Sequence, residues 1–311
     1  MEQKMKELHK MNMNYDEFSR FFCDAVVEKA GPDASGYVTA VQKPNMYASK
    51  ALIITMAGRS AAPVIYLDPY YDDYQKNVPI QVLTDHAIKF YTENYIGKEI
   101  DTRSFRDFSK MKKCVSCRVI DAKRNAKLLA EIPHRLLLDM AVVYYLAFPG
   151  NSAGNTSILV KNEHMKIWKV TEEQLYDIAI GNMVCRKSWR ILTIGDILAG
   201  FPVTSTDQSR PGIKASMYIL TNENLCYGAG NILIPEAMDA LAQKFNDDIY
   251  VLPSSLHEVI AVSVSAFKDR GVTSLRDMVS DINDSYVSME DVLTSSVYRY
   301  YRTTHELVIA E

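Results

Sequence analysis

The sequence predicts an α+β fold of two regions, with mixed or antiparallel sheets and helices packed on one face. Short β-branched runs bounded by turn residues, such as residues 51–56 and 63–67, indicate strands. Amphipathic segments with capping residues indicate helices. The chain has 311 residues, of which 48% are hydrophobic and 23% charged, so it can bury a substantial core.

The first predicted region covers residues 14–150. Asn14 and Glu17 form a capping box before an apolar helical stripe that Gly31-Pro32 ends. Residues 68–76 are predicted as a loop or a short helical turn. The most apolar stretch, residues 134–148, is predicted as one long strand or a pair of strands, and helix stays open because periodicity cannot settle a continuously apolar run. The remaining predicted elements are strands at residues 37–42, 51–56, 63–67 and 114–120 and helices at residues 79–96, 102–112 and 125–130.

The second predicted region covers residues 151–311. A short strand is expected at residues 156–160, and Thr171 with Gln174 forms a second capping box. A short helix at residues 193–199 precedes a linker or mobile loop at residues 201–212. A β-β-α-β-β-α core follows. Its strands are predicted at residues 217–220, 225–234, 249–252 and 259–264, and its helices begin at Pro235 and Thr273.

Charge and composition limit the classes of function. The net charge of −3 and the pI of about 6.1 give no bulk attraction to phosphate backbones, so nucleic acid is not an expected partner. The alternative is that nucleic acid binds to a basic segment at residues 103–113. No stretch is apolar enough to span a membrane, and the charged first ten residues lack the apolar core of a secretory signal. Five cysteines, an odd number, predict a reducing cytoplasm rather than a disulfide framework.

Several phrases occur together along the chain. They are residues 132–135 (IPHR), 162–164 (NEH), 168–176 (WKVTEEQLY), 217–222 (MYILTN) and 252–260 (LPSSLHEVI). Their order resembles domain of unknown function 5688, an uncharacterised family of anaerobic Firmicutes often found near integrative mobile elements. The resemblance extends from about Tyr15 to about Tyr300. It implies a bacterial cytoplasmic protein, as an accessory gene of a mobile element, and it implies no chemistry.

The densest polar group lies at residues 252–258. Ser255 is a candidate nucleophile with His257 as its base, or His257 and Glu258 act as base and acid. In a strand, Ser255 and His257 would stand about 6.6 Å apart, which is too far for a direct hydrogen bond without a turn. The competing interpretation is a corner between strands whose polar side chains bind backbone groups.

Three further groups are weaker candidates. His134 and Arg135 could join His164 in a polar binding site, because arginine binds carboxylate or phosphate with two hydrogen bonds. Tyr70, Tyr71 and Tyr74 could form a partner-binding patch, since tyrosine is favoured at interfaces. Cys114 and Cys117 are spaced as a Cys-x-x-Cys pair, but no second pair completes a zinc site, so no metal and no cofactor are predicted.

The sequence contains no strong catalytic motif. We therefore expect a non-catalytic binding or regulatory protein, with a protein or small-molecule partner. The alternative is a hydrolase-like enzyme that uses His257 with Glu258 or Ser255.

Overall fold

The computed structural model describes residues 12–41, 49–56, 63–94, 105–148, 156–198, 217–253, 255–268 and 271–311. Antiparallel sheets and helices make an α+β fold, as predicted. The described residues divide into two compact units. The first contains the described residues up to Asp107, together with Phe148 and Thr156. The second contains Phe108–Ala147 and the described residues from Ser157 to Glu311.

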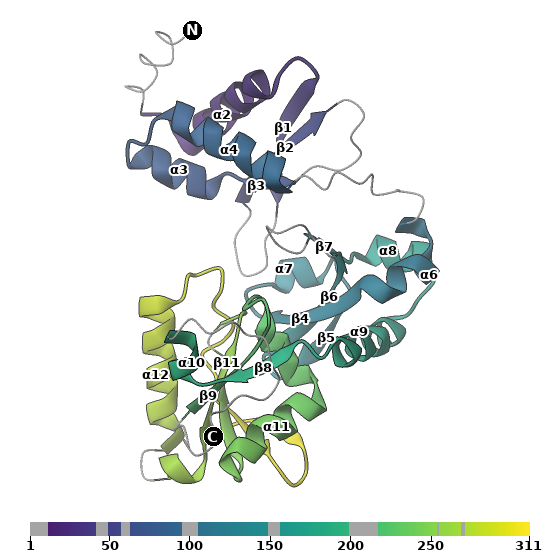
Figure 1. The fold of residues 1–311 in the computed structure, drawn as a ribbon, viewed down its shortest axis with the longest axis vertical. Coiled ribbons are helices and arrows are strands. Elements are labelled where there is room, and N and C mark those ends of the chain that lie inside the picture. Colours follow the sequence, from purple (N-terminus) through teal and green to yellow (C-terminus); the bar gives the residue numbers. More distant parts are fainter. Residues whose placement is uncertain are drawn as a thin grey trace. The chain divides into compact units, whose positions relative to one another are not determined.

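The first unit is a three-stranded antiparallel sheet covered by helices (Figure 1). The sheet order is β1 (Ala34–Val41), β2 (Ser49–Met56), β3 (Val64–Tyr66). The helices are α2 (Tyr15–Ala30), α3 (Asp68–Gln75) and α4 (Ile80–Asn94). The predicted capping box at Asn14 and Glu17 is confirmed, since each side chain accepts from the other residue's backbone amide.

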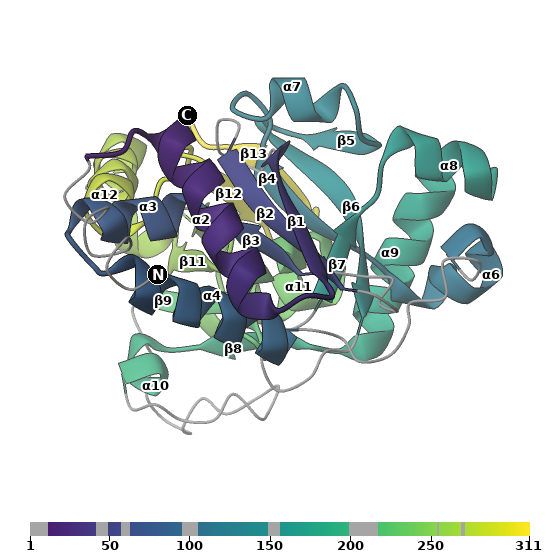
Figure 2. The same ribbon diagram turned by 90° about the horizontal axis from the view of Figure 1, so that it is seen from above.

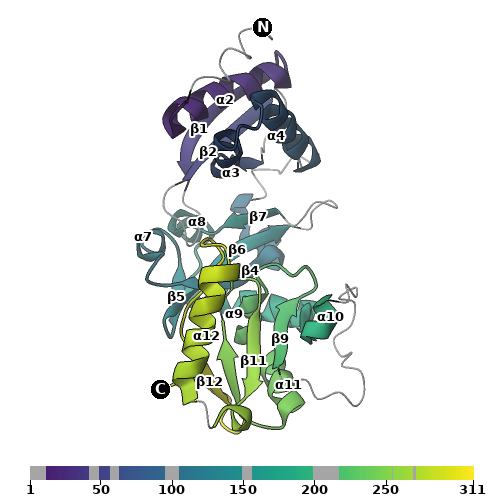
Figure 3. The same ribbon diagram turned by 90° about the vertical axis from the view of Figure 1, so that its left-hand side faces the viewer.

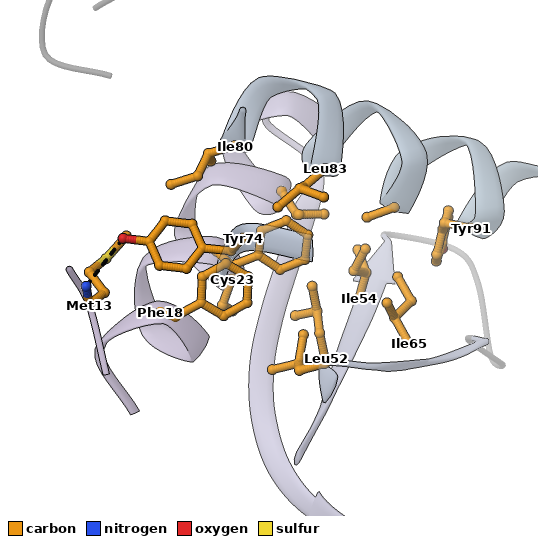
Figure 4. Packing of buried hydrophobic residues seen from close by; sticks show 14 residues of the cluster. Met13, Phe18, Cys23, Leu52, Ile54, Ile65, Tyr74, Ile80, Leu83 and Tyr91 are labelled. Carbon is orange, nitrogen blue, oxygen red and sulfur yellow. Dashed lines mark hydrogen bonds between the residues drawn. The ribbon is translucent and has the colours of Figure 1, made fainter. Parts of the chain in front are cut away.

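Buried side chains from all three helices meet one face of this sheet. Phe18 of α2, Tyr74 of α3 and Leu83 of α4 pack with Leu52 and Ile65 of the strands, as Figure 4 shows. The residues 68–76, predicted as a loop or helical turn, form a helix whose tyrosines supply part of this core. The unit therefore closes a hydrophobic core from its own residues.

The second unit contains a four-stranded sheet. Its order is β4 (Val115–Asp121), β6 (Met140–Phe148), β5 (His134–Leu137), and β7 (Thr156–Leu159) also pairs with β6. The apolar stretch at residues 134–148 is thus a pair of strands, one of the predicted alternatives, and it turns at Leu138 with φ 58°. The short elements α6 (Phe108–Met111), η1 (Lys112–Cys114), α7 (Ala126–Leu129) and α8 (Asn162–Trp168) flank these strands.

Helix α9 (Glu172–Arg186) packs against β4 (Figure 2). Its capping box at Thr171 and Gln174 is confirmed. Asn182 fixes the helix to the start of β4, because its side-chain amide donates to the carbonyls of Lys112 and Val115.

The second unit also contains a six-stranded antiparallel sheet. Its order is β13 (Glu306–Ile309), β12 (Tyr298–Tyr301), β10 (Ile249–Leu252), β11 (Val259–Ser263), β9 (Met217–Asn222), β8 (Trp189–Leu192). Strands β8, β12 and β13 were not predicted. Helix α10 (Ile194–Leu198) follows β8, and the 3₁₀ turn η3 (Ser265–Phe267) follows β11. The predicted linker at residues 201–212 lies outside the described residues, as do residues 103 and 104 of the predicted basic segment.

Helices cover both faces of this sheet (Figure 3). Leu275 and Val279 of α12 (Gly271–Tyr286) pack with Leu252 and Val262 on one face. On the other face, Tyr218 of β9 meets Phe245 of α11 (Pro235–Phe245), with ring centroids 5.1 Å apart. No helix among the described residues is long and apolar enough to cross a membrane.

One predicted strand is wrong. Residues 225–234 form a turn and a 3₁₀ helix, η2 (Gly228–Leu233), so the predicted β-β-α-β-β-α core lacks its second strand. The backbone departs from extended geometry because Leu225 and Tyr227 adopt φ of 51° and 55°. These left-handed conformations are incompatible with a strand.

Candidate functional site

The candidate site lies in the second unit, where three loops meet beside the six-stranded sheet. Cys226 is in the turn between β9 and η2, His257 is between β10 and β11, and Asp291 is between α12 and β12. The Nε2 atom of His257 lies 3.0 Å from Oδ1 of Asp291. Its other ring nitrogen, Nδ1, accepts a hydrogen bond from the Tyr227 amide at 3.1 Å.

Cys226 precedes Tyr227, so its thiol lies in the turn that contacts the His257 ring, and its side chain is the largest cause of the raised pKa of His257. Cys226 is exposed, whereas His257 and Asp291 are partly buried. The site therefore combines a contact between an imidazole and a carboxylate with an exposed thiol in the adjoining turn.

Asn222, the last residue of β9, shapes the turn that presents Cys226. Its side-chain oxygen accepts from the amides of Asn224 and Cys226, both at 3.1 Å, and its side-chain nitrogen donates to the Cys226 carbonyl at 2.7 Å. Such local bonds are the way asparagine replaces backbone pairing in turns. They hold the backbone on both sides of the thiol.

The turn is docked tightly onto the segment that carries His257. The Thr221 hydroxyl donates to the His257 carbonyl at 2.8 Å, and the Ala229 amide donates to the Leu256 carbonyl at 3.2 Å. A Cβ atom at Gly228 would lie 2.5 Å from the His257 carbonyl oxygen and from the Thr221 hydroxyl. Only glycine allows this approach.

Asp291 is itself oriented. Its Oδ2 atom accepts from the Ser288 hydroxyl at 2.5 Å, which leaves Oδ1 for His257. Its carbonyl accepts from the Leu256 amide at 2.8 Å, and the next residue, Val292, forms a bridge with Ser255. These bonds join the Asp291 loop to the His257 segment.

The pKa of His257 is raised to about 9. The largest cause is the hydrogen bond with Cys226, followed by desolvation, which opposes the rise, and by the charge of Asp291. The Tyr227 amide favours the neutral ring, since it donates to Nδ1. The interactions with Cys226 and Asp291 outweigh these opposing effects, so the pKa is raised.

The predicted residues Ser255 and Glu258 lie beside His257, but their bonds differ from those expected. Ser255 is buried, and its hydroxyl oxygen accepts from the His257 backbone amide at 2.9 Å rather than binding the ring. Burial raises the pKa of Glu258, and the His257 charge and the Ser255 side chain oppose this rise. This geometry is that of a polar corner and does not place Ser255 as a nucleophile toward the imidazole.

The other predicted histidines have separate partners. His134 Nδ1 lies 3.1 Å from the Ile132 carbonyl, and His164 Nδ1 accepts from the Lys161 amide at 3.0 Å. No group of three metal-binding side chains occurs in the part of the chain that the structure describes. The guanidinium of Arg135 is already paired with a carboxylate, because its Nε and Nη2 atoms donate to the two oxygens of Glu172 at 3.2 and 3.0 Å.

The predicted tyrosine patch and cysteine pair have packing roles. Tyr70, Tyr71 and Tyr74 lie against the aromatic rings of α2, with ring centroids between 5.0 and 5.3 Å from Tyr15, Phe18 or Phe22. Cys117 is buried beside Met183, with 3.4 Å between their sulfur atoms, and burial raises its pKa to about 12. Cys114 is part of η1 and is half-buried.

Cys226 and Asp291 were missed in the sequence. No local spacing relates either residue to His257, and their proximity depends on the antiparallel pairing of β9 with β11. The sequence signal that could have indicated this part of the site is the polar turn at residues 221–224, which directly precedes the segment with Cys226. From the sequence alone, this turn indicates only a loop between strands.

Together, the fold and the site define an α+β protein in which an imidazole contacts a carboxylate and an exposed thiol lies in the adjoining turn. A model of the family of unknown function DUF5688 matches residues 15–302, so the chain belongs to this family. Comparison with curated proteins and with solved structures gives no match.

Proposed function

We propose that the protein is a thiol-dependent acyl hydrolase, with Cys226 as nucleophile, His257 as its base and acid, and Asp291 as the residue that positions His257. The observation that carries this proposal is that His257 contacts Asp291 at 3.0 Å and the amide of Tyr227, the residue after the exposed Cys226, at 3.1 Å. A thiol beside an oriented imidazole is the arrangement that activates cysteine for attack on a carbonyl. This is the hydrolase alternative with a different nucleophile from Ser255.

The chemistry follows from the positions of the three groups. In its neutral form, His257 accepts the thiol proton, and the sulfur attacks an acyl carbonyl to form a tetrahedral adduct. The adduct expels an amine or alcohol, which takes the proton from His257 and leaves a thioester on Cys226. Water then attacks the thioester with His257 as base, releasing the carboxylic acid and the free thiol.

The test is acylation of the full chain by p-nitrophenyl acetate. We expect a burst of p-nitrophenolate of about one equivalent per chain. Cys226→Ser and His257→Gln should abolish the burst. Cys185→Ser is the matched control, because Cys185 is also exposed but lies in α9, away from His257.

A burst that survives Cys226→Ser would show that another group reacts and would overturn the proposal. The proposal is also overturned if the wild-type protein gives no burst and iodoacetamide labels Cys226 no faster than Cys185. Circular dichroism of each variant separates loss of reactivity from loss of folding.

A non-catalytic binding or regulatory role is the second candidate. It is favoured by the Tyr227 amide, which occupies Nδ1 of His257, and by the bonds of Ser255 within its own corner. In this case His257 locks the loops together. His257→Gln would then lower stability, while acylation of Cys226 would be equal in the wild type and the variant.

We place either function in a bacterial cytoplasm, as an accessory of a mobile element. The support is the resemblance of the sequence motifs to domain of unknown function 5688. A free exposed thiol also suits a reducing compartment. Fractionation of a native host with an antibody against the chain tests the compartment. Recovery outside the cytoplasm would overturn it.

A further inference from the structure

Arg118 is a buried cation near the candidate site. It lies in β4, opposite Val143 of β6, and only 7% of its surface is exposed. Its backbone is closely covered by η2, since a Cβ atom at Gly230 would lie 3.3 Å from the Arg118 Cα. The side chain is therefore confined between the sheet and the segment that follows Cys226.

Two tyrosine rings flank the guanidinium. Its central carbon lies 4.8 Å from the ring centroid of Tyr145 and 4.4 Å from that of Tyr227. Aromatic faces attract a cation, but they do not accept hydrogen bonds from the N–H groups as carboxylates do. Among the described residues, Arg118 Nε has no hydrogen-bond partner and no acidic side chain pairs with the guanidinium.

Comparable arginines in this chain do have a carboxylate. Arg135 lies over Tyr176 and binds Glu172, and Arg299 lies over Tyr301 and binds Asp248. Arg190, which is also buried, binds Glu223. Arg118 has the aromatic contacts of the first two and the burial of the third, but it lacks their anion.

We propose that Arg118 binds the carboxylate of a ligand, between the rings of Tyr145 and Tyr227. A carboxylate would supply the planar acceptor that matches the guanidinium fork. Because Tyr227 follows Cys226 and its ring centroid is 5.5 Å from that of His257, the bound group would lie beside the candidate site. The inference goes beyond the proposed function, since carboxylate binding does not require a reactive thiol.

The test is titration of the full wild-type protein with benzoate, followed by the NMR signals of arginine Nε–H groups. We expect one saturable shift, assigned to Arg118 by its loss in Arg118→Lys. In Arg118→Gln the benzoate affinity, measured by titration calorimetry beside the wild type, should fall by about tenfold or more, because a charge-assisted bond is lost. Arg135→Gln is the matched control, and it should leave benzoate binding unchanged.

Cys226→Ser should also bind benzoate as the wild type does, so failure of the hydrolase proposal and failure of this one are distinguishable. Inorganic phosphate and sodium chloride are titrated in parallel. Saturable binding of phosphate without binding of benzoate would overturn the carboxylate assignment. The absence of any saturable response in the wild-type protein would overturn the site, and this outcome does not depend on a variant that folds.

Discussion

The imidazole of His257 has partners on both ring nitrogens, so its protonation affects both reactivity and stability. Nε2 faces Asp291, and Nδ1 accepts from the Tyr227 amide. In the sequence, His257 could be recognised as a candidate because it lies two residues after Ser255 and directly before Glu258. Its partners could not, because they come from loops that only the folded sheet brings together.

The raised pKa of His257 predicts a pH dependence of stability. A group whose pKa is higher in the folded state stabilises the fold fully below its unfolded pKa of 6.5, and this contribution is lost as the pH rises toward about 9. We expect a decrease of about 2 kcal/mol in the free energy of unfolding across this window, after allowance for solvent screening. Urea unfolding at several pH values measures it.

His257→Gln is the control for this pH dependence, since glutamine keeps a polar side chain that does not titrate. The variant should show a smaller loss of stability between pH 6.5 and 9 than the wild type. Equal losses in both proteins would assign the dependence to other groups.

At the scale of elements, the turn from Asn222 to Gly228 shows where sequence patterns fail. Residues 225–234 contain the apolar residues of a strand, yet side-chain bonds from Asn222 and the docking of Gly228 impose a turn and η2. By contrast, the capping boxes at Asn14 and Thr171 were recognisable because they are local, with the bonded partners three positions apart. Strands β12 and β13 were missed in a stretch of mixed polar and aromatic residues.

Gly228→Ala should destabilise the protein by about 3 kcal/mol, because the added methyl group would overlap the His257 carbonyl and the Thr221 hydroxyl. Chemical unfolding followed by circular dichroism measures the change. The matched control is Gly181→Ala in α9, where a Cβ atom would meet nothing within 4 Å. This variant should gain about 0.5–1 kcal/mol from helix propensity.

A similar effect of the two alanine substitutions would contradict the close approach at Gly228. If Gly228→Ala folds but is weakened, its benzoate affinity and its reactivity at Cys226 will show whether the loop has shifted.

At the scale of the whole molecule, the α+β class was predictable because composition and element types determine it. The division into two units was harder to predict from the sequence, because it depends on which strands pair. Among the described residues, the hydrophobic core of the first unit is formed by side chains between Met13 and Tyr91. This observation makes it possible to test whether the unit folds without the rest of the chain.

A fragment of residues 1–107 should fold without the rest of the chain. Its size is near the range in which one core suffices, so we expect a cooperative but modest thermal transition. Dispersed amide signals in the NMR spectrum of the fragment provide the measurement. A collapsed spectrum, with the same residues ordered in the full chain, would show that the second unit is required.

The strand order of the six-stranded sheet has a consequence for synthesis on the ribosome. Strands β8 and β9 pair first, the β10–β11 hairpin then adds through β11, and the β12–β13 hairpin adds through β12. Each hairpin joins the exposed edge left by the preceding one, and no strand has to insert between two that are already paired. The sheet can therefore grow in the order in which the polypeptide emerges, with each new edge covered soon after it forms.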